Sequence, residues 1–212
     1  MTNRDRYLQN FVDTGFPTIL VNNYLPGMDF NHVTCDYSQA GRLAGEHLIG
    51  LGHRSIGLIH GAFEVQTTFD LRQGLEAGIS GGGVRLLPSR VEDGFYTEEG
   101  GESASIKLIG RDPKITAILA ENAKMAIGAL SGLKSIGLRV PQDVSVMGCD
   151  DIHQAAFCEP ALTMIHTPLF ELGRQACLRL FDLIDGKINS VAEMFDVSLT
   201  RRGSTAAVRA DR

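Results

Sequence analysis

The chain has 212 residues, of which 43% are hydrophobic and 21% are charged, and its formal net charge at pH 7 is −5. This length and composition are typical of a soluble globular protein whose core fills one large domain or two small ones. A net negative charge gives no support for nucleic-acid binding by this chain alone, because such surfaces are usually basic, and no run reaches the roughly 18 apolar residues of a membrane span.

The N-terminal part of the chain predicts one strand and one helix. Residues 17–21 are an apolar run that predicts a buried strand, and the polar pair Asn22 and Asn23 follows it. After a turn-rich connector, the spacing of apolar residues predicts a helix that begins with Ser38 as its N-cap and ends at Gly52.

The middle of the chain predicts strands and helices in alternation. Apolar runs predict buried strands over 55–61, 115–120 and 143–148, and a further possible strand over 84–91 that has Pro88 against it. Helical spacing predicts helices over 68–79, over 97–110 with Thr97 as N-cap, and from the N-cap Asn122 to Gly137. The glycine-rich segment 78–84 follows a helix instead of opening one, so we interpret it as a turn and not as a phosphate-binding loop.

The C-terminal part of the chain changes character after Asp151. Residues 152–168 predict a long connector with two prolines, 169–186 predict an amphipathic helix, and 192–204 predict a final strand and a polar tail. The strands upstream are continuous apolar runs, and short loops join them to helices. Together these features predict an α/β fold with a doubly wound parallel sheet that is covered by helices on both faces.

The N-terminus and the cysteines bear on the cellular compartment. Residues 1–17 lack the apolar stretch of a signal peptide, which favours the cytoplasm, although a chain trimmed at its N-terminus would look the same. No CxxC or CxxH spacing occurs, so we expect reduced, mostly buried thiols at Cys35, Cys149, Cys158 and Cys177. A metal site is conceivable from Cys149, Asp150, His153 and Cys158, but we expect neither a metal nor a cofactor.

Motifs for catalysis are missing from the sequence. There is no GxSxG or HExxH motif, and no histidine pairs with a serine or cysteine in a recognisable nucleophile motif. We therefore expect that the chain is not an enzyme. Of the three functions considered for this chain, an α/β enzyme is the least favoured. His53 directly follows Gly52, and we interpret it as part of a helix C-terminus, where a cation or a hydrogen-bond donor is favourable.

Four segments carry a resemblance to a known family. They are CDYSQAGRLAGEHLIGLGHRSIGLIHG (35–61), VEDGFYTEEGG (91–101), ITAILAENAKMAIGALSGLKSIGLRVPQDVSVMGCDD (115–151) and EPALTMIHTPLFELGRQA (159–176). They resemble the effector-binding domain of the LacI/GalR family of bacterial transcription regulators. The likeness extends from about Gly15 to Ser204, with the motifs in the expected order.

The resemblance implies a periplasmic-binding-protein-like architecture, in which two α/β subdomains are joined by three crossovers and a small ligand binds in the cleft between them. It implies a complete second subdomain over 31–165 and 196–204, and a remnant of the first subdomain over 1–30 and 169–195. The family's helix-turn-helix DNA-binding module, hinge and opening βα units have no counterpart in this chain. We therefore expect DNA contact only through the missing N-terminal domain, and leave open whether Met1 is the natural start.

The resemblance assigns three effector contacts to strand ends and their loops. Asp150 matches a carboxylate that accepts hydrogen bonds from effector hydroxyls; it could instead only cap a turn, and Asp151 is expected to be the structural member of the pair. Asn122 matches an effector-contacting asparagine, and the alternative is a helix N-cap alone. Tyr96 takes the place of an aromatic that packs against the effector ring, and the alternative is an ordinary core or surface aromatic.

Three further positions complete the expected site. Asn22 stands where the family commonly has an aspartate, and its amide adds a donor. Thr67 matches a ligand-side position in some relatives. The family usually has an arginine on the following helix, but strict alignment puts Leu71 there and Arg72 one residue on, which is a turn of about 100° around a helix. Either Arg72 takes the role of the family's effector-binding arginine, or this chain lacks that arginine. Because strict alignment does not place an arginine there, a neutral effector is favoured over one that carries a carboxylate.

The function implied by the resemblance is ligand sensing. A sugar-like or nucleoside-like effector, which we expect to be neutral, would bind in the cleft and change the DNA affinity of the missing headpiece by population shift. The full-length form would be a homodimer with no membrane contact. The alternative is a stand-alone periplasmic-type sugar-binding protein. We expect this chain to bind ligand weakly or not at all, because one cleft wall is reduced to Asn22 and its neighbours. We expect it to keep only part of the dimer contacts, because much of the first subdomain is lost.

Overall fold

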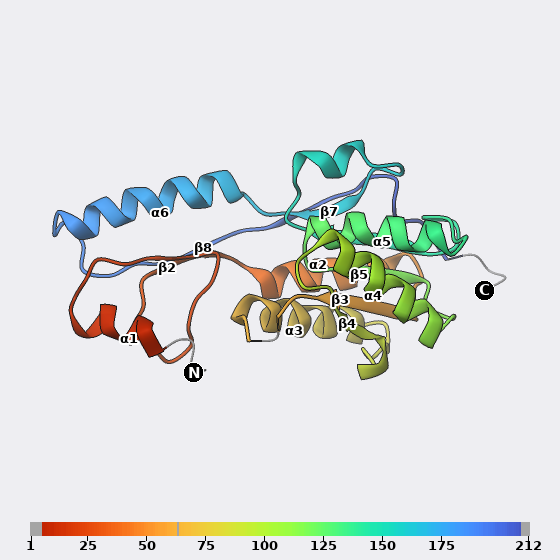
Figure 1. Ribbon diagram of the computed structural model, residues 1–212, viewed down its shortest axis with the longest axis horizontal. Helices are drawn as coiled ribbons and strands as arrows, with labels where there is room; N and C mark the ends of the chain where they lie inside the picture. Colours follow the sequence, from red (N-terminus) through yellow and green to blue (C-terminus); the bar gives the residue numbers. More distant parts are fainter. Residues whose placement is uncertain (1–5, 63, 209–212) are drawn as a thin grey trace.

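The computed structural model describes residues 6–62 and 64–208, which form two sheets placed end to end along the long axis of the molecule (Figure 1). The larger sheet has six strands in the order β4-β3-β5-β6-β7-β9. These strands are β3 (Ile56–His60), β4 (Val91–Asp93), β5 (Ala117–Ala120), β6 (Ser145–Cys149), β7 (Thr163–His166) and β9 (Ser198–Thr200). All neighbours pair in parallel except β7 and β9, which are antiparallel.

Helices cover both faces of the larger sheet. Leu119 of β5 lies in one buried cluster with residues of α2 (Tyr37–Gly50) and α3 (Gln66–Ser80). Its neighbour Ile118 points the other way, into a second buried cluster with residues of α4 (Glu98–Arg111) and α5 (Ala123–Ser135). Every residue of β3, β5 and β6 is buried, as continuous apolar strands of a two-sided sheet should be. The predicted doubly wound α/β fold is confirmed.

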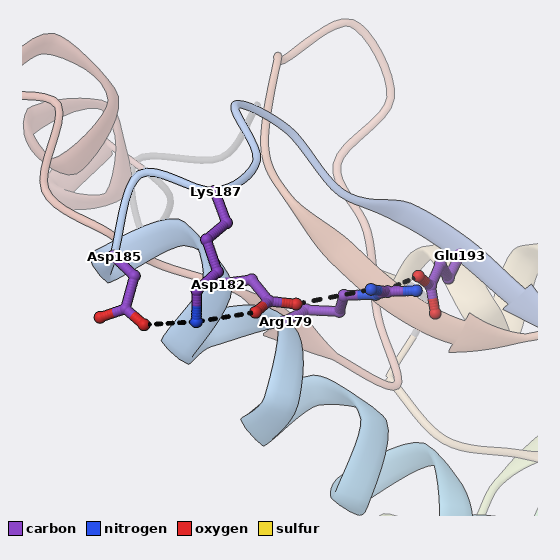
Figure 2. Close-up of polar contacts among 5 residues, drawn as sticks. All are labelled: Arg179, Asp182, Asp185, Lys187 and Glu193. Atoms are coloured by element: carbon purple, nitrogen blue, oxygen red, sulfur yellow. Dashed lines mark hydrogen bonds and ion pairs between the residues drawn. The ribbon is translucent and has the colours of Figure 1, made fainter.

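The smaller sheet has three parallel strands, β1 (Leu20–Val21), β2 (His32–Cys35) and β8 (Ala192–Phe195), with β2 in the middle. Helix α6 (Leu169–Ile184) packs against β2, and α1 (Arg6–Asp13) lies on the other side of this sheet (Figure 1). Figure 2 shows how α6 is tied to β8: the Arg179 guanidinium contacts Glu193 at 2.5 Å and Asp182 at 3.5 Å. Lys187 continues the row of charges by contacting Asp185 at 2.7 Å.

The chain crosses between the two sheets three times, after β2, between β7 and α6, and between β8 and β9. The resemblance implied a first boundary after residue 30, but β2 pairs with β1 and β8 in the smaller sheet, so that boundary falls after Cys35. At the last crossing the chain passes from β8 in the smaller sheet to β9, which pairs with β7 in the larger sheet.

Several predicted elements differ from the structure for identifiable reasons. The strand expected over 17–21 is only Leu20–Val21. The segment 84–91 forms a short 3-10 turn at Pro88, whose missing N–H suits a turn better than a strand, and β4 begins after it. The connector expected over 152–168 contains a 3-10 helix (His153–Phe157) and the buried strand β7. In place of the one final strand expected within 192–204, the structure has two strands, β8 in the smaller sheet and β9 in the larger one.

The helix ends follow their local chemistry. Thr97 and Asn122 cap α4 and α5 as predicted, by accepting backbone hydrogen bonds from Gly100 and Met125. Helix α2 is capped by Asp36, which accepts from Gln39 N at 2.8 Å, and not by Ser38. Gly52 has a positive φ of 89° just after α2, which stops the helix there. No helix among the described residues is both long enough and apolar enough to cross a membrane.

Candidate ligand-binding cavity between the two sheets

A cavity of about 350 Å³ lies where the carboxyl ends of strands from both sheets meet. In an open α/β sheet this is the edge at which ligands bind. The smaller sheet supplies Asn22, directly after β1, and Tyr37 begins α2 after the chain leaves β2. The larger sheet supplies the other lining residues, which are Val65, Thr67, Tyr96, Glu121, Asn122 and Asp150.

Five of the six residues expected in the site line this one cavity, and they are Asn22, Thr67, Tyr96, Asn122 and Asp150. Arg72 does not. It lies on the outer side of α3, where its Nε contacts Glu76 Oε1 at 3.0 Å. Leu71, the strictly aligned position, is fully buried in the core. The helical turn that buries Leu71 therefore directs Arg72 outward, and no arginine is among the described residues that line the cavity.

Hydrogen bonds connect the two sheets across the cavity. Asn22 Nδ2 donates to the Tyr37 hydroxyl at 2.9 Å, and that hydroxyl donates to Asp150 Oδ1 at 2.8 Å. Thr167, on the crossover between β7 and α6, donates to the same Asp150 oxygen at 3.0 Å. One oxygen of Asp150 is thus held by two residues of the crossovers. Its other oxygen makes no hydrogen bond to any residue that the structure describes.

A second cluster of hydrogen bonds centres on Glu121, which is 4% exposed. Its Oε2 accepts from the backbone N–H of Gly61 at 2.5 Å, and its Oε1 accepts from the Thr68 hydroxyl at 2.6 Å. The Tyr96 hydroxyl lies 2.8 Å from Thr68 Oγ1 and 3.4 Å from Glu121 Oε1. Because Gly61, Tyr96 and Glu121 follow β3, β4 and β5, this cluster joins three adjacent strand ends.

The cavity rim holds the chain in an uncommon backbone conformation. Among the described non-glycine residues, positive φ angles occur at Asn22 (56°), Phe95 (53°), Tyr96 (60°) and Asp150 (60°). Three of these four line the cavity, and the fourth is adjacent to Tyr96. A positive φ at a non-glycine residue costs conformational free energy. Residues in such strained backbone conformations cluster at binding sites and switch regions of proteins.

The electrostatics of the cavity are set by two carboxylates. Burial raises the pKa of Glu121, and the negative charge of Asp150 adds to this, while hydrogen bonds from Thr68, Gly61 and Tyr96 oppose it. Burial likewise raises the pKa of Asp150 against the donors Tyr37 and Thr167. Burial and the charge of Glu121 raise the pKa of Tyr96 to about 12. No lysine, arginine or histidine is among the described lining residues, so the cavity can accept hydrogen bonds and disfavours anions.

Tyr37 and Glu121 are the two polar lining residues that sequence reasoning missed. Tyr37 precedes the N-cap that the sequence predicts at Ser38, so it falls outside the predicted helix. Glu121 directly precedes Asn122 at the end of a buried strand, the same location that singled out Asp150. A charged residue at such a strand end was the available signal.

Three other expectations concern residues outside the cavity: His53, the four cysteines and Asp151. His53 lies at the C-terminal end of α2 as expected, where its backbone N–H donates to the Leu48 carbonyl at 3.0 Å. The residue is 2% exposed, and burial lowers the pKa of its ring to about 4, so it is neutral near pH 7 and serves there as a donor and not as a cation. Of the four free cysteines, Cys35 and Cys149 are buried, Cys158 is intermediate and Cys177 is exposed. The expectation of mostly buried thiols therefore holds for only half of them. Asp151 contacts Arg202 at 2.7 Å, in line with its expected structural role.

Comparison with known proteins shows a matching family model and a similar curated protein. Residues 46–205 match a family model described as a periplasmic binding protein-like domain. The HTH-type transcriptional repressor CytR of Escherichia coli (strain K12) is 34% identical over 193 residues, which are 91% of this chain and 57% of CytR. The chain thus spans little more than half the length of the curated relatives it matches.

Two solved structures are similar over almost the whole chain. One is a sugar-binding transcriptional regulator of the LacI family from Escherichia coli, complexed with phosphate, with a TM-score of 0.82, 29% identity, and coverage of 96% of this chain and 73% of that one. The other is a LacI family transcriptional regulator from Enterococcus faecium with bound ribose, with a TM-score of 0.87, 26% identity, and coverage of 97% and 76%.

Proposed function

The chain belongs to the periplasmic binding protein-like domain family, in the form found in LacI/GalR transcriptional regulators, and from this premise we propose that it senses a small sugar-like or nucleoside-like effector in the cavity between its two sheets. It is a binding protein in this proposal, not an enzyme. The observation that carries the proposal is the convergence of Asn22 from one sheet and Asp150 from the other on one cavity of about 350 Å³.

The polar atoms that the protein leaves open support a hydroxylated, uncharged ligand. Asp150 Oδ2 is an open acceptor, and the buried Asn22 Oδ1 has no hydrogen-bond partner among the described residues. The Asn122 Oδ1 atom is used to cap α5, which leaves its Nδ2 as a donor toward the ligand. Tyr96 offers an aromatic ring beside these groups, and sugars and nucleosides present both hydroxyls and an apolar face to such a wall.

The regulatory mechanism that we propose is a population shift. A ligand that contacts Asn22 and Asp150 together favours one relative placement of the two subdomains over others, and it can shift that equilibrium only by its differential affinity. In the full-length protein, which we propose to be a cytoplasmic homodimer, this placement would control an N-terminal DNA-binding domain. Exposed apolar side chains on α6, among them Phe170 (86%) and Phe181 (62%), support an association surface on the smaller subdomain.

The proposal is tested by NMR titration of the chain with D-ribose, D-galactose, cytidine and adenosine, a format that also detects weak binding. We expect at least one of these to shift resonances of cavity residues, and Asp150→Asn to weaken its binding at least about tenfold through loss of a charge-assisted hydrogen bond. Asp196→Asn, at an exposed aspartate outside the cavity, is the matched control. Binding of none of the four, or equal binding by Asp150→Asn, would overturn the proposal.

A further inference from the structure

Glu121 is a buried carboxyl group without a counter-ion among the described residues. It is 4% exposed and lines the cavity, and it forms no ion pair with any described residue. Its hydrogen bonds come from the Gly61 N–H at 2.5 Å, from the Thr68 hydroxyl at 2.6 Å and from the Tyr96 hydroxyl at 3.4 Å. These donors are neutral, so they satisfy the lone pairs of the carboxylate but leave its charge uncompensated.

The contacts of Glu121 also fix the aromatic wall of the cavity. Tyr96 has a positive φ of 60°, and its hydroxyl is held by Thr68, which itself donates to Glu121. The Tyr96 ring lies so close to Gly61 that a Cβ at Gly61 would overlap it. Glu121, bound to the N–H of the same Gly61, therefore holds both the ring and the backbone that the ring rests on.

A second uncompensated carboxylate lies in the same cavity. Asp150 accepts hydrogen bonds from the hydroxyls of Tyr37 and Thr167, which are again neutral donors. Since no cation is among the described lining residues, ionisation of either carboxyl group makes the field inside the cavity negative. An anion at about 6 Å from one such carboxylate is disfavoured by roughly a hundredfold at an effective dielectric constant of about 20.

We propose that Glu121 is a specificity-determining residue of this cavity, which positions Tyr96 and, together with Asp150, excludes ligands that carry a phosphate or carboxylate. The ligand class is thereby narrowed to uncharged sugars or nucleosides as distinct from their phosphate esters. This inference rests on the proposed function of the cavity. It adds a residue, Glu121, whose carboxylate repels anionic ligands. The lack of an arginine among the described lining residues, by contrast, only removes an attraction for anions.

The experiment compares matched ligand pairs at pH 8: D-ribose with D-ribose 5-phosphate, and cytidine with cytidine 5′-monophosphate. The parent chain is expected to bind the uncharged member of a pair and to discriminate against the phosphate by at least about tenfold. Glu121→Gln is expected to narrow this ratio by about tenfold, mainly by improved binding of the phosphate. Glu99→Gln, at an exposed glutamate outside the cavity, controls for the change in net charge.

A purely structural role of Glu121 would give a different pattern. Disorder of Tyr96 weakens both members of a pair equally and leaves the ratio unchanged, as we expect for Thr68→Val, which removes the donor without removing the charge. If no uncharged member binds, the proposed function fails and this inference fails with it. If the uncharged member binds but Glu121→Gln leaves the ratio unchanged, only this inference is overturned. If Glu121→Gln does not fold, equal affinity of the parent for both members of a pair still overturns it.

Discussion

The hydroxyl of Tyr37 donates a hydrogen bond of 2.8 Å to Asp150, and this bond joins the first residue of α2 to the end of β6. Through Asn22, which donates to the same hydroxyl at 2.9 Å, the smaller sheet is connected to the larger one. The two oxygens of Asp150 therefore differ: Oδ1 accepts hydrogen bonds from Tyr37 and Thr167, and Oδ2 accepts none from the described residues. A ligand at Oδ2 would add to this arrangement without replacing it.

Replacement of Tyr37 by phenylalanine tests the contribution of this bond to stability. The variant keeps the buried ring but leaves Asn22 Nδ2 without its acceptor and Asp150 Oδ1 with Thr167 as its one remaining donor, so we expect a loss of about 2 kcal/mol in the free energy of unfolding. Urea denaturation measures it. Tyr24→Phe is the matched control, because the Tyr24 hydroxyl makes one hydrogen bond, to Asp70, at a more exposed position. Equal losses in the two variants would contradict the special role of Tyr37.

His53 predicts a defined pH dependence of stability. Its ring nitrogens contact Thr116 Oγ1 at 3.0 Å and the Ala206 carbonyl at 3.1 Å, and burial lowers its pKa from 6.5 to about 4. Since the pKa is lower in the folded state, the unfolded chain binds the proton first as the pH falls. The contribution of the neutral ring is complete above pH 6.5 and decreases as the pH falls toward 4, by about 3 kcal/mol over that window.

The measurement is the free energy of unfolding from pH 7.5 to 4.5, for the parent and for His53→Gln. Other groups contribute to both profiles, so the difference between them isolates His53. We expect the parent to lose more stability than the variant on acidification. His166→Gln, at an exposed histidine, should follow the parent profile. Parallel profiles for the parent and His53→Gln would show that His53 does not carry this dependence.

The fold could be predicted from the sequence where each element carries its own signal. The strands β3, β5 and β6 are continuous apolar runs, and Thr97 and Asn122 act within their own helical turns as caps, so nothing distant is needed to recognise them. β7 was missed because prolines at 160 and 168 flank its short apolar run and favour a connector. The split of 192–200 into two strands could not be read, because it depends on which sheet each half joins.

The site residues that follow a strand could be predicted from the sequence, whereas their hydrogen-bond partners could not. Asn22, Asn122 and Asp150 each follow a strand, and the carboxyl ends of parallel strands meet at one edge of a sheet. The partners of Asp150 are different: Tyr37 is 113 positions away in the sequence and Thr167 lies on another crossover. Their convergence depends on the path between the sheets, which local patterns do not contain. The sequence pattern also could not decide whether Leu71 or Arg72 faces the ligand. In the structure, the packing of α3 buries Leu71 in the core and places Arg72 beside Glu76, so neither lines the cavity.

Asp151 and Arg202 form an ion pair next to the cavity residue Asp150, and we expect it to stabilise the fold. The Asp151 oxygens accept from the two Arg202 amino groups at 2.9 and 2.7 Å, and the Asp151 side chain is 8% exposed. Arg202 also donates to the Leu162 carbonyl at 2.7 Å. We expect Asp151→Asn to lower the free energy of unfolding by about 2 kcal/mol, since it weakens a charge-assisted, bidentate contact.

The comparison for this pair is Glu46→Gln, which breaks the exposed ion pair with Arg42 at 2.9 Å and should cost less than about 0.5 kcal/mol. Urea denaturation of both variants gives the contrast. Asp151→Asn is also expected to leave the ligand titration of the folded protein unchanged, in contrast to Asp150→Asn. Loss of ligand binding in Asp151→Asn would exchange the roles of the two carboxylates.

The contact between α2 and α3 depends on glycines at which no side chain fits. A Cβ at Gly74 would overlap the Ser38 carbonyl of α2, and one at Gly41 would overlap the Leu71 carbonyl of α3, so the two backbones lie directly against each other. Gly74→Ala must separate backbone from backbone, which no rotamer change can relieve. We expect it to lower the free energy of unfolding by about 2 kcal/mol, even though alanine favours a helix by about 1 kcal/mol over glycine.

The matched control for Gly74→Ala is Gly173→Ala in α6, where a Cβ meets no atom within 4 Å. There the helix propensity acts alone, so we expect a gain of about 0.5–1 kcal/mol. Thermal or urea unfolding of both variants should therefore show shifts of opposite sign from the same chemical change. A gain at both positions would mean that α2 and α3 can separate by a methyl group at no cost. Because Tyr37 and Thr67 lie on these two helices, such freedom would also reach the cavity wall.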